Sequence, residues 1–423
     1  MDWPLRKIRS QFLALQRQQD GRDVALFDGP AGSQVPESVV DAVCSYLRHT
    51  NCNRGAAFRT ARESDAILNN AHQVFADFLG ADDPDCVAFG ANMTSLTLQL
   101  SRALSQSWQP GDEIIVTRLD HDANVTPWGL AARDRGVTVR YVEMNSNDWT
   151  LSQDDFRSKL SDRTKLVAVG YASNATGTIN PVQQMTELAH QFGALVFVDA
   201  VHFAPHGRIR VDQICCDFLA CSAYKFFGPH VGIMWGRRQL LEEIRPYKLR
   251  PSPESLPGRW MTGTQCHEGI AGAAAAVEYL CSLDDLFHSD DASQPEGHRD
   301  DRRSARLDRV FARIMEYERG LSETLLTGLK SIPGLRLWGI SDLSDLDQRV
   351  PTVSFTLDGR SPREAAEWLA GRGLYVWNGN HYALPFTETA GLEPGGTVRV
   401  GALHYNSREE IDRLIEAIHE YQC

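Results

Sequence analysis

The chain has 423 residues, of which 42% are hydrophobic and 23% are charged, the composition of a globular protein with room for two domains. Its net charge of −12 argues against non-specific binding of nucleic acids. No run of about eighteen apolar residues predicts a membrane span. The charged segment 1–20 is not followed by an apolar signal core, so we expect a cytoplasmic protein.

The first expected elements are an amphipathic helix over 1–20, a short strand at 25–28 and a tight loop at 29–32. Helical periodicity follows at 36–49 and 63–79.

Between residues 86 and 235, strand patterns alternate with helical ones. Strands are expected at 86–89, 113–117, 137–142, 166–170, 195–199, 217–221 and 231–235. Helices are expected between them at 93–106, 124–135, 152–160 and 181–192. Such alternation predicts an α/β domain with a mostly parallel sheet, in which ligands bind at the carboxyl ends of the strands.

The last third of the chain predicts a smaller α+β domain. Residues 284–304 are polar and dense in charge, which is typical of a solvated loop. Helices are expected after it at 305–330, 361–372 and 407–421, and strands at 335–338, 350–357, 374–377 and 397–402. The nine cysteines of the chain are scattered without disulfide or metal spacing, so we expect reduced thiols.

An acid and a lysine follow two of the expected strands. Asp199 ends the apolar run 195–199, and Lys225 follows the next strand in a run of small and aromatic residues. Pyridoxal phosphate (PLP) needs this pair: the lysine forms a Schiff base with its aldehyde, and the acid keeps the ring nitrogen protonated. Either residue alone is more simply explained as a buried polar group. The motifs around them favour the cofactor.

The segment 90–95 follows a strand and opens a helix, which is where proteins commonly hold phosphate. Asn92, Met93 and Thr94 are therefore candidate phosphate ligands, although Asn and Thr also serve as ordinary helix caps. Ser222 and Tyr224, beside the lysine, can donate further hydrogen bonds to the same group.

Three polar residues after other strands are candidates for contacts with the ring. His121 can lie over a planar ring and handle protons, or simply cap a helix. Asn174 and His202 can reach the phenolic oxygen of the cofactor. Arg399 lies in an apolar strand near the C-terminus, and a buried arginine needs an anion such as an amino-acid carboxylate or an internal acid.

In this order, the motifs resemble those of the class V aminotransferase family of fold-type I PLP enzymes, and most closely the cysteine desulfurases of the SufS type. The resemblance covers nearly the whole chain. It implies that Lys225 and Ser222 form the Ser-x-x-Lys Schiff-base motif, that Asp199 pairs with the pyridine nitrogen and that His121 stacks on the ring.

The resemblance also implies contacts with an amino-acid substrate. Arg399 matches the carboxylate-binding arginine, and Ala31 lies in a loop like the one that closes over substrate. Arg54 lies in a turn similar to the family's His-Arg-Gly turn, and Asn124 matches a neighbour of the stacking histidine.

The domain organisation implied by the resemblance is a large PLP-binding domain and a small C-terminal domain. We expect an N-terminal arm at 1–25 that joins the small domain, the large domain at 26–290, a mobile loop at 291–304 and the small domain at 305–423. The expected assembly is a homodimer in which Thr264 reaches the phosphate site of the partner.

The sequence differs from the SufS-type cysteine desulfurases at one position that bears on function. Desulfurases carry a cysteine in a small-domain loop that accepts sulfur, whereas Tyr382 stands at the matching position and residues 282–422 contain no cysteine. A phenol cannot accept sulfur as a thiolate does. Trp377 replaces an arginine of many desulfurases, and with Asn380 it is expected on the substrate side. His381 and Tyr382 are candidates for a second acid–base group.

We therefore expect a PLP-dependent lyase that eliminates a group from the β- or γ-carbon of an amino acid, after the substrate has displaced Lys225 and the ring has absorbed the carbanion. An epimerase, an aminotransferase or a carbon–carbon bond-forming cyclase is the alternative. A PLP-binding subunit without catalysis is a further alternative, which the presence of both Lys225 and Arg399 disfavours. No metal is expected.

Overall fold

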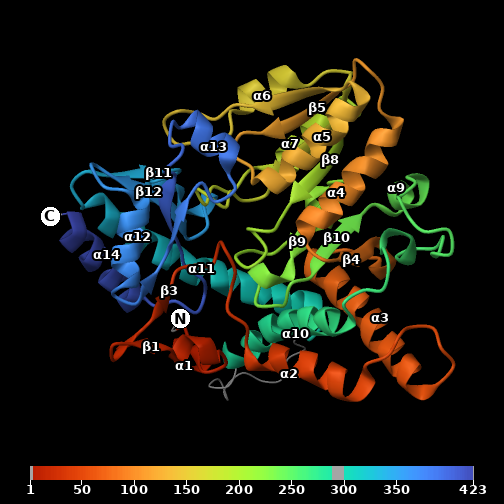
Figure 1. Ribbon diagram of the computed structural model, residues 1–423, viewed down its shortest axis with the longest axis horizontal. Coiled ribbons are helices and arrows are strands. Elements are labelled where there is room, and N and C mark those ends of the chain that lie inside the picture. Colours follow the sequence, from red (N-terminus) through yellow and green to blue (C-terminus); the bar gives the residue numbers. More distant parts are fainter. Residues whose placement is uncertain (1–2, 288–299, 423) are drawn as a thin grey trace.

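The computed structural model describes residues 3–287 and 300–422. Figure 1 shows a large mixed α/β part and a smaller part that contains the C-terminus. Most of the expected loop at 291–304 lies outside the described residues. Within the described part of the chain, none of the helices combines the length and hydropathy that a membrane span requires.

The large part is built on a seven-stranded sheet in the order β4-β10-β9-β8-β7-β5-β6. Its strands are β4 (Val87–Gly90), β5 (Glu113–Thr117), β6 (Thr138–Val142), β7 (Thr164–Gly170), β8 (Leu195–Asp199), β9 (Phe218–Ser222) and β10 (Gly232–Gly236). Only β10 runs antiparallel to its neighbours. The predicted α/β fold with a mostly parallel sheet is confirmed.

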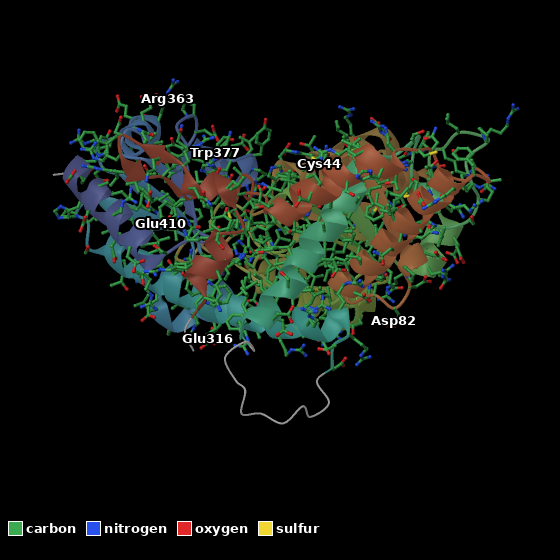
Figure 2. All side chains as sticks on the ribbon, turned by 90° about the horizontal axis from the view of Figure 1, so that it is seen from below. Cys44, Asp82, Glu316, Arg363, Trp377 and Glu410 are labelled. Atoms are coloured by element: carbon green, nitrogen blue, oxygen red, sulfur yellow. The ribbon has the colours of Figure 1, made fainter. Side chains whose placement is uncertain are left out.

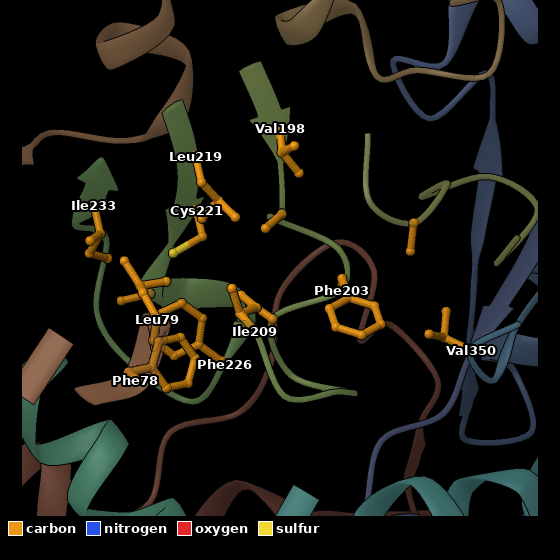
Figure 3. Close-up of a cluster of buried hydrophobic side chains, with 14 of the residues drawn as sticks. Phe78, Leu79, Val198, Phe203, Ile209, Leu219, Cys221, Phe226, Ile233 and Val350 are labelled. Atoms are coloured by element: carbon orange, nitrogen blue, oxygen red, sulfur yellow. The ribbon is translucent and has the colours of Figure 1, made fainter. Parts of the chain in front are cut away.

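Helices cover both faces of this sheet, so its strands other than the edge strand β6 are buried along most of their length. The helices are α2 (Glu37–Ser45), α3 (Arg59–Leu79), α4 (Met93–Leu104), α5 (Thr126–Arg135), α6 (Gln153–Lys159), α7 (Val182–Gln191), α8 (Val211–Ile214), α9 (Arg238–Glu243) and α10 (His267–Leu283). Figure 3 shows Cys221 and Ile233 of the sheet above Phe78 of α3 and Phe226, which follows Lys225. This core supports the strand ends from below.

The smaller part has an antiparallel four-stranded sheet in the order β11-β12-β15-β14. The strands are β11 (Leu335–Trp338), β12 (Thr352–Leu357), β14 (Trp377–Gly379) and β15 (Thr397–Gly401). The helices α11 (Arg303–Lys330), α12 (Pro362–Ala370), α13 (Leu384–Thr389) and α14 (Arg408–Gln422) accompany it. Its own apolar core contains Phe355 and Leu414.

The N-terminal segment differs from the expected single helix over 1–20. Helix α1 covers only Leu5–Arg9, and two-residue strands β1 (Gln18–Gln19) and β2 (Arg22–Asp23) follow a 3₁₀ turn. The helix stops because the Gln11 carbonyl accepts a hydrogen bond from the Glu37 amide, and the fully buried Phe12 packs edge-on against Tyr279. Next, β3 (Ala25–Leu26) pairs in parallel with β13 (Leu374–Tyr375) of the smaller part.

Two expectations about the middle of the chain were also wrong. Helix α10 was not expected, because its apolar run with two glycines and five alanines has no clear period. The start of the expected loop 284–304 is not solvated: Asp284 is fully buried in an ion pair with Arg309, 2.6 Å between Oδ2 and Nη2. At the other end of that loop, α11 already begins at Arg303.

Candidate active site

The carboxyl ends of β4, β5, β7, β8 and β9 meet at one edge of the large sheet, because β10 reverses direction between β4 and β9. The loops that follow these strands surround a cavity of about 570 Å³. This volume suits a cofactor or small ligand. The residues singled out in the sequence that line it are Asn92, Met93, Thr94, His121, Asn174, Asp199, His202, Ser222, Tyr224 and Lys225.

Lys225 ends a short 3₁₀ turn directly after β9, which brings its side chain into the cavity. Its Nζ donates hydrogen bonds to the carbonyl oxygens of Pro30 and Ala31, the latter at 3.0 Å. It also lies 4.8 Å from the ring centroid of Tyr224. Carbonyl acceptors and an aromatic face hold the amine in place without a carboxylate in direct contact.

Burial and the positive charge of Arg399 lower the pKa of Lys225 to about 7, while Asp199 and Asp28 act in the opposite direction. A substantial fraction of the amine is therefore uncharged near neutral pH. An uncharged, desolvated lysine is the form that attacks an aldehyde or takes a proton from carbon.

Asp199 ends β8 opposite Gly170 of β7 and is 7% exposed. Its Oδ1 accepts a hydrogen bond of 2.9 Å from the Val201 amide. Burial raises the pKa of Asp199 to about 6, and the charge of Lys225 opposes this rise. The carboxyl group is thus largely ionised at pH 7 and can pair with a protonated ring nitrogen.

The N-terminus of α4 forms another wall of the cavity. Asn92 caps this twelve-residue helix by accepting from the Ser95 amide, and the Met93 amide donates to the Ser222 hydroxyl at 2.9 Å. The amide of Thr94 has no acceptor among the described residues. It therefore remains available for an anion, as does the hydroxyl hydrogen of Ser222.

His121 follows β5, and its Nδ1 accepts from the Ala123 amide at 3.0 Å, which leaves the proton of the neutral ring on Nε2. Burial, with the charges of Lys225 and Arg399, lowers the pKa of His121 to about 4. Its ring stacks with that of Tyr382, with centroids 5.6 Å apart and planes at 14°. The expected ring-facing histidine is therefore neutral and held by its neighbours.

Arg399 is 4% exposed on β15, and its Nη1 donates to the Asn174 carbonyl at 3.0 Å. Its Nε has no hydrogen-bond partner, and no described carboxylate forms an ion pair with it. Burial lowers the pKa of Arg399 to about 9, although Asp28 acts against this. An arginine that lacks an anion in the fold itself has its donors free for the carboxylate of a ligand.

The loop with Tyr382 lies above the strand that carries Arg399. Trp377 pairs with Arg399 across β14 and β15, and is 51% exposed (Figure 2). Tyr382 is 72% exposed with φ +56°, and its amide donates to Asn380 Oδ1 at 3.1 Å. His381 turns away, since its Nε2 bonds to Thr397 Oγ1 at 3.0 Å.

The structure places three other candidates away from the cavity. Asn124 is fully buried, donating to Asp120 and accepting from Trp128, so it is no substrate ligand in this arrangement. Arg54 and Thr264 line a separate hollow. Asn174 lines the cavity as expected, but its Nδ2 donates to the His381 carbonyl and only Oδ1 is without a partner.

Asp120 also lines the cavity, although it was not among the expected site residues. Its carboxylate accepts from Thr117 Oγ1 at 2.6 Å and from Asn124 Nδ2 at 3.2 Å. A Cβ on Gly170 would stand 2.5 Å from its Oδ1, so the missing side chain makes room for it. Burial and the charge of Asp199 raise the pKa of Asp120 to about 7.

We expect Asp120→Asn to become increasingly stabilised relative to the wild type as pH rises from about 4 to about 7. The folded protein binds the proton of Asp120 more tightly than the unfolded chain, so the wild type loses stability over this window and the neutral amide does not. Thermal melts of the apoprotein across pH measure the difference. Asp134→Asn, at an exposed position of α5, is the control. A pH-independent difference in Tm would contradict the assignment.

These residues fit PLP: an amine with lowered pKa, an ionisable carboxyl group, an open helix N-terminus and a flat histidine ring converge on one cavity of suitable volume. Such a site on an α/β sheet defines a PLP-dependent enzyme of fold type I. The profile of the family described as Aminotransferase class-V matches residues 25–292 and 307–414. The chain belongs to this family, whose members depend on pyridoxal phosphate.

Similar proteins carry two kinds of description. The chain is 31% identical to "Cysteine desulfurase" of Synechococcus elongatus. The match covers 99% of this chain and 64% of the relative. It is also 31% identical to "Aminotransferase-like protein FGM3" of Gibberella zeae, covering 98% of this chain and 97% of the relative. The apo structure of a cysteine desulfurase from Thermococcus onnurineus superposes with a TM-score of 0.86 at 25% identity, covering 100% and 98% of the two chains.

The expected class, fold and cofactor are thereby confirmed, and the chain is a PLP-dependent enzyme that acts on amino acids. This also removes the alternative of a subunit without catalysis.

Proposed function

We propose that the protein eliminates a substituent from the β- or γ-carbon of an amino acid without forming a protein persulfide. Two features together carry this proposal. The guanidinium of Arg399 is free to bind a substrate carboxylate, and the neighbouring loop contains no thiol that could accept sulfur. Arg399 is buried without an acid, and Tyr382 stands in the adjoining loop, within a segment without cysteine.

In this proposal Lys225, Asp199 and the start of α4 hold the cofactor. Bound PLP supplies an electron sink that accepts the negative charge left when a proton leaves the α-carbon. Asp199 pairs with the ring nitrogen, the Thr94 amide and Ser222 hydroxyl bind the phosphate, and His121 packs against the ring.

Arg399 then grips the substrate carboxylate, which fixes the orientation of the α-carbon. Lys225 Nζ, with its pKa lowered to about 7, removes the α-proton. Trp377, Asn380 and Tyr382 lie on the side where the substrate's own side chain projects. In this proposal the phenol of Tyr382 gives a proton to the leaving group.

Epimerisation is the second candidate function, and the exposed phenol of Tyr382 favours it as a proton donor distinct from Lys225. We also propose a homodimer. Arg54 and Thr264 are exposed and do not line the cavity of their own chain, which supports a role for both in the partner's site.

The test is incubation of the holoenzyme with L-cysteine, O-acetyl-L-serine, L-cystathionine and L-alanine. Elimination expels the substituent together with the α-proton, and water then hydrolyses the resulting enamine to a 2-oxo acid and ammonia. We therefore expect these products from the first three compounds and none from alanine. Mass spectrometry after L-cysteine should show no protein-bound sulfur. Added sulfur on a thiol such as the exposed Cys266 would instead establish a desulfurase. Racemised substrate without oxo acid would establish the second candidate.

A further inference from the structure

His202 borders the cavity, and a buried charged pair lies directly behind it. We propose that Glu318 and His206 are positioning residues that keep His202 neutral, with its Nδ1 directed at the phenolic oxygen of the cofactor. This deepens the proposed function, because it concerns the same site.

The first observation is how His202 is held. It is 4% exposed, three residues beyond Asp199, and its Nε2 lies 3.1 Å from Thr352 Oγ1 on β12. Nε2 is therefore engaged with the smaller part of the molecule. Nδ1 is the nitrogen left for the cavity, which His202 lines.

The second observation is the pair behind it. His206 Nδ1 and Glu318 Oε2, on α11, are 2.7 Å apart, and both residues are 2% exposed. The rings of His206 and His202 stand edge to face, with centroids 5.4 Å apart and planes at 73°. His206 Nε2 is buried without a hydrogen-bond partner among the described residues.

These contacts assign a proton to each nitrogen of His206. A carboxylate accepts, so Nδ1 carries a proton. The edge-to-face contact with the His202 ring suits an N–H on the other nitrogen, because the π face of a ring attracts an N–H and repels a lone pair. In the proposal His206 is therefore an imidazolium paired with Glu318, whose pKa is raised by burial and lowered by the charge of His206.

A positive charge next to His202 disfavours a second proton there. Burial is the main reason why the pKa of His202 lies well below its usual range. The charges of His206, Arg399, Lys225 and His121 lower it further. A neutral imidazole carries one N–H. In the proposal the Thr352 hydroxyl donates to Nε2, which places the N–H of His202 on Nδ1, where a phenolate oxygen would accept it.

The test is NMR of the apoprotein labelled with ¹⁵N-histidine, which reads the charge of His202 whether or not the enzyme performs an elimination. His202→Gln identifies the signal. In Glu318→Gln the imidazolium loses its counter-ion and gives up its proton, so we expect the protonated fraction of His202 at a fixed acidic pH to rise about tenfold. Glu316→Gln, at an exposed position of the same helix (Figure 2), should leave it unchanged.

The same variants bear on the cofactor. In PLP-loaded Glu318→Gln and His206→Gln, the pH at which the visible absorption band changes should move in the same direction as in His202→Gln. The His206→Gln protein also serves if the Glu318 variant fails to fold. Unchanged His202 signals in both Glu318→Gln and His206→Gln would overturn the proposal. Loss of elimination activity with normal His202 signals would overturn only the proposed reaction.

Discussion

Lys225→Ala is expected to abolish the visible absorption band that the protein shows with PLP, because no other described lysine lines the cavity and the Schiff base needs this amine. Turnover should fall by a factor of about a thousand or more, since the same amine is the proposed base. Spectra of the purified variant with added PLP measure the first effect, and 2-oxo acid release measures the second.

Lys165→Ala, near the start of β7 and outside the cavity, is the matched control and should keep the band. The Lys225 variant should still bind PLP non-covalently, since Asp199 and the start of α4 are intact. A normal band in Lys225→Ala would remove the central assignment of the site.

Arg399→Ala is expected to raise the substrate KM about a hundredfold or more, with a far smaller loss of PLP affinity. A charged hydrogen bond contributes about 1.5–3 kcal/mol, and the guanidinium offers two toward a carboxylate. Arg399→Met, which retains most of the side-chain volume, separates this loss from a packing defect. Kinetics with the best substrate of the panel and PLP titrations measure the two constants.

Arg399→Lys should recover little of the loss, because an ammonium is a point charge without the planar fork. Arg363→Ala, on the exposed face of α12 (Figure 2), should behave as wild type. Equal losses of substrate and cofactor affinity in Arg399→Met would show that the arginine is structural.

The positions of the site residues along the strands could be predicted, because they depend on local pattern. An apolar run that stops at an acid is visible in the sequence, and β8 ends at Asp199 as expected. The strand before Lys225 and the helix after Asn92 were likewise within a residue or two of their observed bounds.

Side-chain partners could not be predicted in this way. Asn124 matched a motif, yet it bonds to Asp120 and Trp128 inside the core. Asp120 itself was overlooked, because its place beside Asp199 depends on the absent side chain of Gly170, on another strand. The role of Thr264 in a partner's site and that of Arg54 in substrate binding stay predictions.

The sequence by itself determined which chemistry the chain carries, since alternating apolar runs order the strands and each run delivers its polar residue to the same edge of the sheet. Only the tertiary structure decided the charge of those residues and the direction in which they point. Burial, the approach of Arg399 from the other sheet and the contact of α11 with His206 arise between segments far apart in the chain. These distances exist only after packing, so no local pattern encodes them.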